Sequence, residues 1–446
     1  MTSPSNPSHP KTRGPTHSHA PRNLRAQAID SLHRVVQGRS LSTVLPAAQT
    51  HTAERDRALL QELVMGSARQ WFALEAVIAP MLASPPRPIL QAALIVGGYQ
   101  IFFTRIPAHA AISETVEAVK QLGQKNAAGL INAILRRLLR EQDSLRPALE
   151  QHHGLPDWLA SQLQQDWPAR FTALAAELRQ SAPLFLRVNR RQRSRDAYLH
   201  LLHQQDLDAA PTRRPEGIVL LDSASVTQLP GYAEGWFAVQ DDHAQLCAGL
   251  FGDLDGKSVL DACAAPGGKT CHLLEQFTPR QLTALDSDAQ RLTRVEENLK
   301  RLQLQDLCPI TLKATNAATW PAPERFDAIL LDAPCTATGV LRRHPDIRLL
   351  RKPDDVAQTV ALQARLLNQL WNQLQPGGML LYVTCSLLKA ENEQQMADFL
   401  ARTPDAREQP IDADWGEARP RGRQCFPAPE AGDGFYFCRL IKQPAP

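Results

Sequence analysis

The segment VLDACAAPGGKT, residues 259–270, joins a short apolar run to small residues and a Pro-Gly-Gly turn. This pattern predicts a strand that ends at Ala262 and a helix that begins near Lys269. Small residues let a ligand approach the backbone, and the free N–H groups at a helix start favour a carboxylate or phosphate. A tight turn without a ligand is the plainer interpretation. The GxxxxGK[ST] spacing of a P-loop is absent.

Further strand candidates follow this segment, with helical stretches between them. The strands are residues 282–286, 326–332 and 379–385, and the helical stretch 288–302 has an apolar stripe. Alternation of strands and helices implies a parallel, doubly wound sheet, which binds ligands at the carboxyl ends of its strands. We therefore expect an α/β domain over residues 236–446 with a ligand site at that edge.

An acidic residue, Asp286, ends the strand that follows the turn. In doubly wound folds an acid at this place holds ribose hydroxyls. A helix cap is the other interpretation. The turn and the acid together indicate a cofactor that carries a nucleoside, and they leave NAD and S-adenosylmethionine both open.

Two cysteines follow later strands, Cys335 in DAILLDAPCTATG and Cys385 in LLYVTCSLLKAEN. A free cysteine is commonly a small buried apolar side chain. Asp332 and Cys335, however, come at the end of the predicted strand 326–332, so we expect them over the same edge of the sheet as the turn.

The segments DACAAPGGKT, LLDAPCTATGVLRRHPDIR and YVTCS together resemble the Sun-type RNA cytosine carbon-5 methyltransferases. PLFLRVN, GYAEGWFAVQDDHAQ and GDGFYFCRLIK are similar to other parts of that family. The resemblance covers most of the chain. It implies a NusB-like helical RNA-binding domain, a Rossmann-like methyltransferase domain, S-adenosylmethionine as cofactor, and a cytosine of 16S ribosomal RNA as substrate.

The resemblance also implies roles for the two thiols. Cys385 would be the nucleophile, because a thiolate that adds to carbon 6 of cytosine lets carbon 5 attack the methyl donor. Cys335 would aid loss of the carbon-5 proton, and Asp332 would hydrogen-bond the N3 and N4 edge of the base. DNA cytosine methyltransferases use the Pro-Cys cysteine, so Cys335 stays open as the nucleophile.

For the cofactor, the resemblance implies binding by the turn, by Asp286 at the ribose and by the nearby Asp332. The turn residues are Cys263, Ala264, Ala265, Pro266, Gly267, Gly268 and Lys269. Asn316 stands where the family usually has aspartate near the adenine. An amide oxygen can still accept from the adenine amino group, so we expect binding to be retained but weaker.

The chain before the α/β domain divides into three expected parts. Residues 1–21 hold five prolines and no acid, which is typical of a disordered tail. Residues 22–150 carry apolar side chains at helical spacing and predict an all-α domain. Residues 151–235 mix short helices with strand-like pieces, which predicts a small α+β RNA-binding region.

Five arginines within nine residues of that region have no acid among them. They are Arg187, Arg190, Arg191, Arg193 and Arg195. Guanidinium groups form bidentate hydrogen bonds with phosphate oxygens, and their binding releases counterions from the nucleic acid. The pattern therefore favours contact with an RNA backbone. A solvated protein face is the alternative.

The chain of 446 residues exceeds the size of a single core and indicates two or three domains. Its net charge is only +3, and no apolar run reaches the ~18 residues that a membrane span requires. The eight cysteines form no CxxC pair, and no secretory signal is evident. We expect a cytoplasmic monomer without a metal or a membrane anchor.

Two other functions fit parts of the sequence. An amino-group methyltransferase needs no covalent thiol, but DAPC lacks the second proline and the aromatic residue of that motif. An RNA-binding assembly factor with a vestigial sheet domain is the other, and the retained Lys269, Asp286 and both thiols argue against it.

Overall fold

The computed structural model describes residues 23–221 and 225–444, so the prediction for residues 1–21 lies outside the described residues. The chain separates into two compact units. Within the described residues, the first unit consists of residues 23–37, 42–67 and 77–146, and the second of residues 38–41, 68–76, 147–221 and 225–444. Among the described helices, none is both long and apolar enough to cross a membrane.

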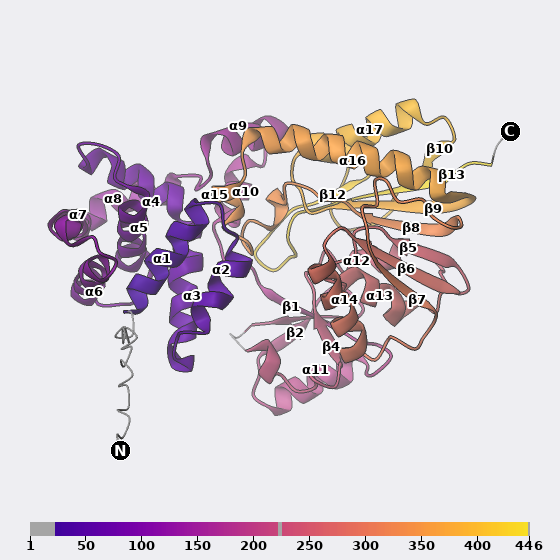
Figure 1. The fold of residues 1–446 in the computed structure, drawn as a ribbon, viewed down its shortest axis with the longest axis horizontal. Coiled ribbons are helices and arrows are strands. Elements are labelled where there is room, and N and C mark those ends of the chain that lie inside the picture. The colour runs from indigo at the N-terminus through magenta and orange to yellow at the C-terminus, as the bar shows by residue number, and fades with distance from the viewer. Residues whose placement is uncertain (1–22, 222–224, 445–446) are drawn as a thin grey trace, which may run out of the picture. The chain divides into compact units, whose positions relative to one another are not determined.

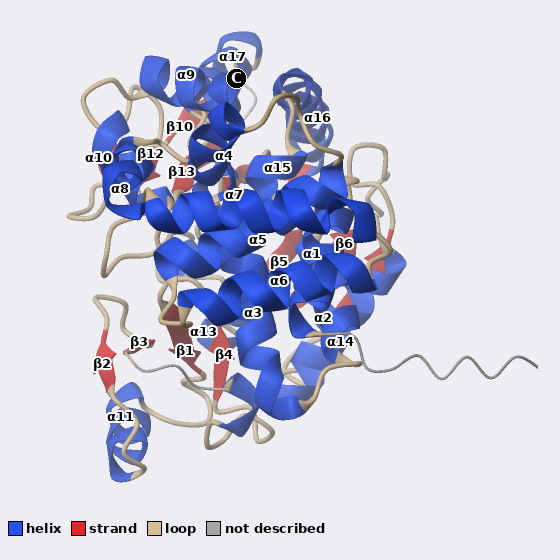
Figure 2. Ribbon diagram, turned by 90° about the vertical axis from the view of Figure 1, so that its left-hand side faces the viewer, coloured by secondary structure: helices blue, strands red, loops and turns tan. Residues whose placement is uncertain are grey.

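The first unit is helical, as the sequence predicts. Helix α5 (Pro88–Phe103) is buried along nearly its whole length and packs against α1, α6 and α7 (Figure 2). A helix that is apolar all round belongs at the centre of a bundle. The elements of this part of the chain are α1 (Leu24–Val36), α2 (Leu41–Gln49), α3 (Glu54–Arg69), α4 (Trp71–Ile78), η1 (Ala79–Met81), α6 (Ala108–Gln121), η2 (Lys125–Ala127), α7 (Ala128–Arg140) and α8 (Gln142–Gln151).

The second unit begins with two helices and a small antiparallel sheet. Its strand order is β2-β3-β1-β4. The two strand-like pieces expected from the sequence, residues 183–189 and 217–221, form β1 and β3 of this sheet. Tyr198 and Phe237 stack in its core with ring centroids 5.5 Å apart. The elements are α9 (Asp157–Asp166), α10 (Phe171–Leu178), β1 (Leu184–Val188), α11 (Arg195–Gln204), β2 (Ala209–Pro211), β3 (Gly217–Leu220), η3 (Val226–Gln228) and β4 (Phe237–Val239).

A larger sheet follows, with strand order β11-β12-β13-β9-β8-β5-β6-β7 and β10 paired to β13. The five strands β9, β8, β5, β6 and β7 are parallel, which confirms the predicted doubly wound part. Their bounds are β5 (Ser258–Asp261), β6 (Gln281–Asp286), β7 (Ile310–Ala314), β8 (Phe326–Asp332) and β9 (Leu374–Thr384).

The sheet also has an antiparallel part, because the C-terminal strands pair antiparallel. They are β10 (Ala406–Glu408), β11 (Glu417–Ala418), β12 (Arg423–Cys425) and β13 (Phe435–Lys442). No helix separates β10 from β13, and a parallel pairing of successive strands needs a long crossover connection. The sheet is therefore mixed.

Helices cover both faces of the large sheet (Figure 1). Apolar side chains of α16 and α17 pack on one face, and those of α12 and α13 pack on the other, where α14 covers β6 and β7. The bounds are α12 (Leu246–Gly249), α13 (Gly268–Gln276), α14 (Ala289–Arg301), η4 (Thr338–Val340), α15 (Ile347–Leu350), α16 (Pro353–Gln373), η5 (Lys389–Glu391) and α17 (Glu393–Arg402).

Candidate active site

A cavity of about 350 Å³ opens at the carboxyl ends of the parallel strands. It brings together side chains that are far apart in the sequence, namely Asp286, Asn316, Asp332, Cys335 and Cys385. Each follows or ends a parallel strand, as the sequence predicts. Arg291, Leu362 and Leu366 also line the cavity and were not predicted.

The turn after β5 closes one end of this cavity. Gly267 adopts a φ of +98° at the N-cap of α13, and a Cβ there would lie 3.1 Å from Val295 Cα. The left-handed conformation and the close packing both explain the glycine. Cys263 and Ala265 line the cavity, whereas Ala264, Pro266, Gly267 and Gly268 complete the turn behind them.

Asp286 is buried and held by backbone N–H groups. Its Oδ2 accepts from Ala265 N at 3.1 Å and its Oδ1 from Asp288 N at 3.0 Å. The side-chain cap of α14 is Asp288, which accepts from Gln290 N and Arg291 N. The carboxylate of Asp286 is thus fixed against the turn, and a helix-capping role falls to its neighbour.

Two further acceptors lie beside the turn. Asn316 Oδ1 accepts from Ala318 N at 2.9 Å, which fixes its amide at the cavity wall. Asp261 is buried, with Oδ2 accepting from Thr270 Oγ1 at 2.6 Å and Oδ1 lacking a partner among the described residues. Burial raises the pKa of Asp261 to about 7. With Asp286, these acceptors suit a ligand that carries hydroxyl and amino groups.

Lys269 reaches from α13 to Asp332, with Nζ 2.5 Å from Oδ2. Burial acts to lower the pKa of Lys269, but the neighbouring Asp332 carboxylate more than offsets it, so that the pKa is raised overall. The lysine is therefore cationic and holds Asp332 at the cavity.

The two thiols face each other, with Cys335 Sγ 3.4 Å from Cys385 Sγ. Both are free cysteines. The hydrogen bond to Cys385, together with burial, raises the pKa of Cys335 well above its ordinary value. Cys335 is therefore held as a protonated thiol.

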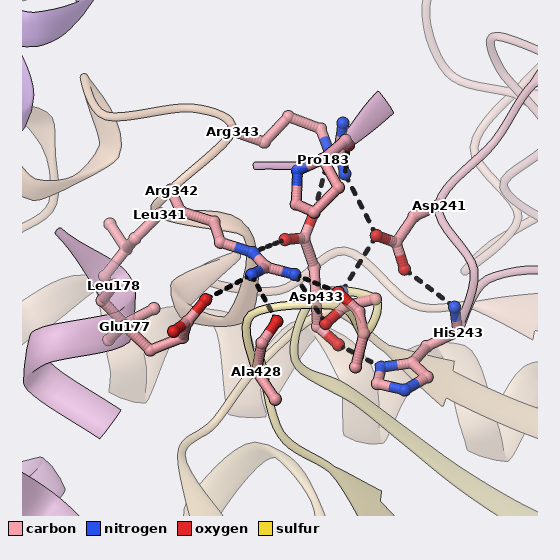
Figure 3. Close-up of polar contacts among 12 residues, drawn as sticks. Glu177, Leu178, Pro183, Asp241, His243, Leu341, Arg342, Arg343, Ala428 and Asp433 are labelled. Atoms are coloured by element: carbon pink, nitrogen blue, oxygen red, sulfur yellow. Dashed lines mark hydrogen bonds and ion pairs between the residues drawn. The ribbon is translucent and has the colours of Figure 1, made fainter. Parts of the chain in front are cut away.

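A buried ion-pair cluster surrounds Asp433 (Figure 3). Arg342 Nε donates to Asp433 Oδ1 at 2.6 Å, and Arg343 Nε donates to Asp433 Oδ2 at 2.7 Å. Beside Asp433, Gly434 N donates to Gly339 O and Gly339 N donates to Cys385 O, both at 2.9 Å. The cluster therefore anchors the C-terminal loop that holds the Cys385 backbone.

The five predicted RNA-contacting arginines do not share one surface. Arg187 is fully buried and pairs with Glu275, with Nε 2.7 Å from Oε2, so the prediction of RNA contact is corrected for this residue. It faces inward because it lies on the central strand β1, and its acidic partner comes 88 positions later.

The other four arginines lie nearer the surface. Arg190 is exposed and lies 3.7 Å from Glu216, and Arg191 donates to Leu274 O and Phe277 O. The Arg193 guanidinium lies 3.8 Å from the centroid of the Trp236 ring. Arg195 donates to the carbonyls of Thr212 and Arg214.

One buried acid near the thiols was missed by sequence reasoning. Glu391 is fully buried and bonds to Thr336 and Ser386, the residues that follow the two cysteines. In a single sequence, a glutamate in KAENE is typical of an exposed helix start, so no local signal indicates its burial.

The same arrangement of domains occurs in known proteins. Residues 251–441 match the family described as 16S rRNA methyltransferase RsmB/F. Residues 22–140 match the NusB family, and residues 155–227 match the ferredoxin-like domain of RsmF/B-like methyltransferases.

Ribosomal RNA small subunit methyltransferase B of Pseudomonas putida is 46% identical over 94% of this chain and 98% of its own. The chain belongs to the RsmB/F family of 16S rRNA methyltransferases. The protein of the same name from Erwinia tasmaniensis is 45% identical over 94% of this chain and 99% of its own. The crystal structure of PH0851, a 21% identical chain, shares the fold with a TM-score of 0.80 over 95% of this chain and 99% of that one. This family membership makes the chain an rRNA methyltransferase.

Proposed function

We propose that this methyltransferase transfers a methyl group from S-adenosylmethionine to carbon 5 of a cytosine in 16S rRNA, through a covalent bond between Cys385 and carbon 6. The observation that carries the proposal is the pair of thiols 3.4 Å apart in the cavity that also holds Asp286 and Asp332. An enzyme that methylates an amino group has no need of two facing thiols.

The acceptors around the turn fit the cofactor. Asp286 would hold the ribose hydroxyls, and Asn316 would accept from the adenine amino group. When bound, S-adenosylmethionine would supply an electrophilic methyl group at the thiol side of the cavity.

Cys385 is the better nucleophile of the two. A thiolate, not a thiol, attacks carbon 6, and Cys335 is held as the thiol by its bond to Cys385. Attack by Cys385 forms the bond from sulfur to carbon 6 and moves the electron pair of the carbon 5–carbon 6 double bond to carbon 5. Carbon 5 then becomes nucleophilic.

Asp332 would stabilise the base as this charge develops. Its carboxyl can meet the N3 and N4 edge of cytosine, and Lys269 Nζ donates a hydrogen bond to it at 2.5 Å. General acid–base assistance of this kind contributes roughly 10²- to 10⁴-fold in rate.

Cys335 would complete the reaction by taking the proton of carbon 5. Once Cys385 Sγ is bonded to carbon 6, its hydrogen bond with Cys335, which is the main cause of the raised pKa of Cys335, is lost. Cys335 can then release its proton to solvent and accept the carbon-5 proton while the bond from sulfur to carbon 6 breaks. S-adenosylhomocysteine would leave when the sulfur–methyl bond of the donor breaks, so the products would be 5-methylcytosine, S-adenosylhomocysteine, one proton released to solvent and the two cysteines in their original states.

For the RNA backbone we propose Arg190, Arg191 and Arg193, which lie toward the surface of the small sheet region. Arg191 and Arg195 are weaker candidates than Arg190, because backbone carbonyls already accept hydrogen bonds from their guanidinium groups. The NusB-like unit would add a second RNA-binding surface, and the target cytosine must leave its stack to reach the thiols. We also propose that the enzyme acts as a cytoplasmic monomer without a metal.

Bisulfite sequencing of 16S rRNA tests the reaction and the substrate together. A strain that lacks this gene should lose one 5-methylcytosine, and the wild-type gene should restore it. A complete set of 5-methylcytosines in the deletion strain would refute the proposed function.

A further inference from the structure

Glu391 is a fully buried acid with no part in the reaction described above. It ends the short helix η5, and its carboxylate accepts three hydrogen bonds. Oε1 accepts from Thr336 N at 2.8 Å, and Oε2 accepts from Thr336 Oγ1 at 2.5 Å and from the Ser386 hydroxyl. These donors come from two different loops.

The donors are the immediate neighbours of the two thiols. Thr336 follows Cys335 in the loop after β8, and Ser386 follows Cys385 in the loop after β9. A single carboxylate therefore ties together the two loops that carry the facing sulfur atoms. Thr338 Oγ1 adds a weaker link, 3.2 Å from Ser386 Oγ.

Glu391 is itself fixed to the end of β9. Tyr382 Oη donates to Glu391 O at 2.7 Å, and Thr384 Oγ1 donates to Asn392 Oδ1 at 2.5 Å. On the other side, Arg351 Nε donates to Thr336 O at 3.1 Å. The carboxylate thus has a rigid support, and its position can define the spacing of the two loops.

A buried carboxylate is costly unless its hydrogen bonds are complete. Burial raises the pKa of Glu391, and the bonds from Ser386 and Thr336 oppose that shift. An apolar contact between the loops would avoid this cost but would not fix their spacing, because hydrogen bonds are directional and apolar packing is not.

We propose that Glu391 is a positioning residue that keeps Cys335 and Cys385 in hydrogen-bond contact. The inference rests on the proposed function, because it assigns the thiols their roles. Without this clamp, the Glu391 carboxylate bonded to Thr336 and Ser386, the two loops separate. Cys385 Sγ is then no longer positioned to attack carbon 6, and Cys335 Sγ no longer reaches the carbon-5 proton. Misplacement by about 1 Å can cost roughly 100-fold in rate.

The test compares Glu391→Ala with Glu391→Gln in the full-length chain. The alanine variant should lower kcat about 100-fold, with the affinity for S-adenosylmethionine and the KM for RNA changed less than about threefold. The glutamine variant should recover kcat to within about tenfold of wild type. Its amide oxygen can accept from Thr336 N, and the rotatable hydroxyls can accept from its NH₂ group.

The matched control is Glu393→Ala, two residues along the same segment. Glu393 Oε2 accepts from Arg419 Nε at 2.6 Å and its Oε1 lies 3.8 Å from Lys389 Nζ, so its ion-pair partners are not the residues beside the two thiols. This variant also loses a partly buried acid, so its kcat should stay within about twofold of wild type, as for a distant site.

A crystal structure of Glu391→Ala supplies a readout that does not depend on activity. The distance between Cys335 Sγ and Cys385 Sγ should grow from 3.4 Å to beyond hydrogen-bond reach. An unchanged distance, or a kcat like that of wild type, would overturn the proposal. Equal losses in the alanine and glutamine variants would also overturn it, since they would indicate a role for the charge.

If Glu391→Ala does not fold, Thr336→Val and Ser386→Ala replace it, because each removes one hydroxyl from the clamp. Each should lower kcat about tenfold and lengthen the distance between the sulfur atoms. A wild-type kcat in both would refute the clamp. The Sγ–Sγ distance is measured without substrate. It therefore tests the clamp even if the proposed reaction is wrong.

Discussion

The two halves of the cavity are built in different ways. At the cofactor half, Asp286 and Asn316 accept hydrogen bonds from backbone N–H groups of the adjacent turns. At the thiol half, Cys335 contacts Cys385, and Glu391 bonds to the residues that follow both. The first half is held mainly by backbone donors, with Arg291 Nη1 3.8 Å from Asp286 Oδ1 as a looser ion pair, and the second is a network of side chains.

This difference predicts different responses to substitution. Substitutions of side chains that are held mainly by backbone donors have independent effects, whereas the effects of substitutions within one hydrogen-bond network are coupled. Changes at the cofactor half should therefore weaken binding and leave turnover at saturation largely intact. Changes at the thiol half should lower turnover and leave binding largely intact.

The largest expected effect is at Cys385. Cys385→Ala removes the proposed nucleophile and should lower kcat by roughly 10⁴-fold or more. Affinity for S-adenosylmethionine, measured by calorimetry, should stay within about threefold of wild type, since removing a transition-state contact leaves ground-state binding. Transfer of labelled methyl groups to RNA at more than a tenth of the wild-type rate would show that another group attacks.

Asp332→Asn should have the next largest effect. The amide cannot share a proton with Lys269 in the same way, so kcat should fall about 10²- to 10³-fold. RNA affinity, measured by filter binding, should be nearly unchanged. A large loss of RNA affinity with normal kcat would assign Asp332 to substrate binding.

Asp286→Ala tests the cofactor half. Loss of a charged acceptor should weaken S-adenosylmethionine binding by about 1.5–3 kcal/mol, or roughly 10- to 100-fold. The kcat at saturating cofactor should stay within a few fold. Asn316→Asp sharpens the comparison, because a charged acceptor should tighten binding by up to about tenfold. Calorimetry that shows no change in either variant would place the cofactor elsewhere.

The smallest effect concerns the surface arginines. Each phosphate contact adds about one released counterion to the slope of log K for RNA binding against log salt concentration. Replacing Arg190, Arg191 and Arg193 with alanine should therefore make this slope shallower by up to about three. kcat at saturating RNA should be retained. A slope identical to that of wild type would exclude direct phosphate contact.

Much of the site follows from the sequence, since topology brings strand ends together. Asp286, Asp332, Cys335 and Cys385 each end or follow a predicted parallel strand, and parallel strands place their carboxyl ends at one edge. The strand and helix pattern thus gave both the α/β fold and the cavity. Family resemblance added the roles, which the spacing does not determine.

The remainder depends on partners distant in sequence. Arg187 lies in an arginine-rich segment but pairs with a glutamate 88 positions away. Glu391 bonds to Thr336 across 55 positions. Neither partner is visible in a local pattern, because burial of a charge is decided by tertiary packing. The antiparallel strands were missed because β10, β11 and β12 have only two or three residues each, and because no helix separates the longer β13 from β12.

The most direct test of the central claim is a covalent trap for each thiol. Cys335→Ala and Cys385→Ala are each incubated with 16S rRNA and S-adenosylmethionine, then analysed on a denaturing gel. If Cys385 attacks and Cys335 aids release, Cys335→Ala should accumulate a denaturation-resistant protein–RNA adduct, while Cys385→Ala should form none and transfer no methyl group. An adduct in Cys385→Ala that is absent in Cys335→Ala would contradict the account and make Cys335 the nucleophile.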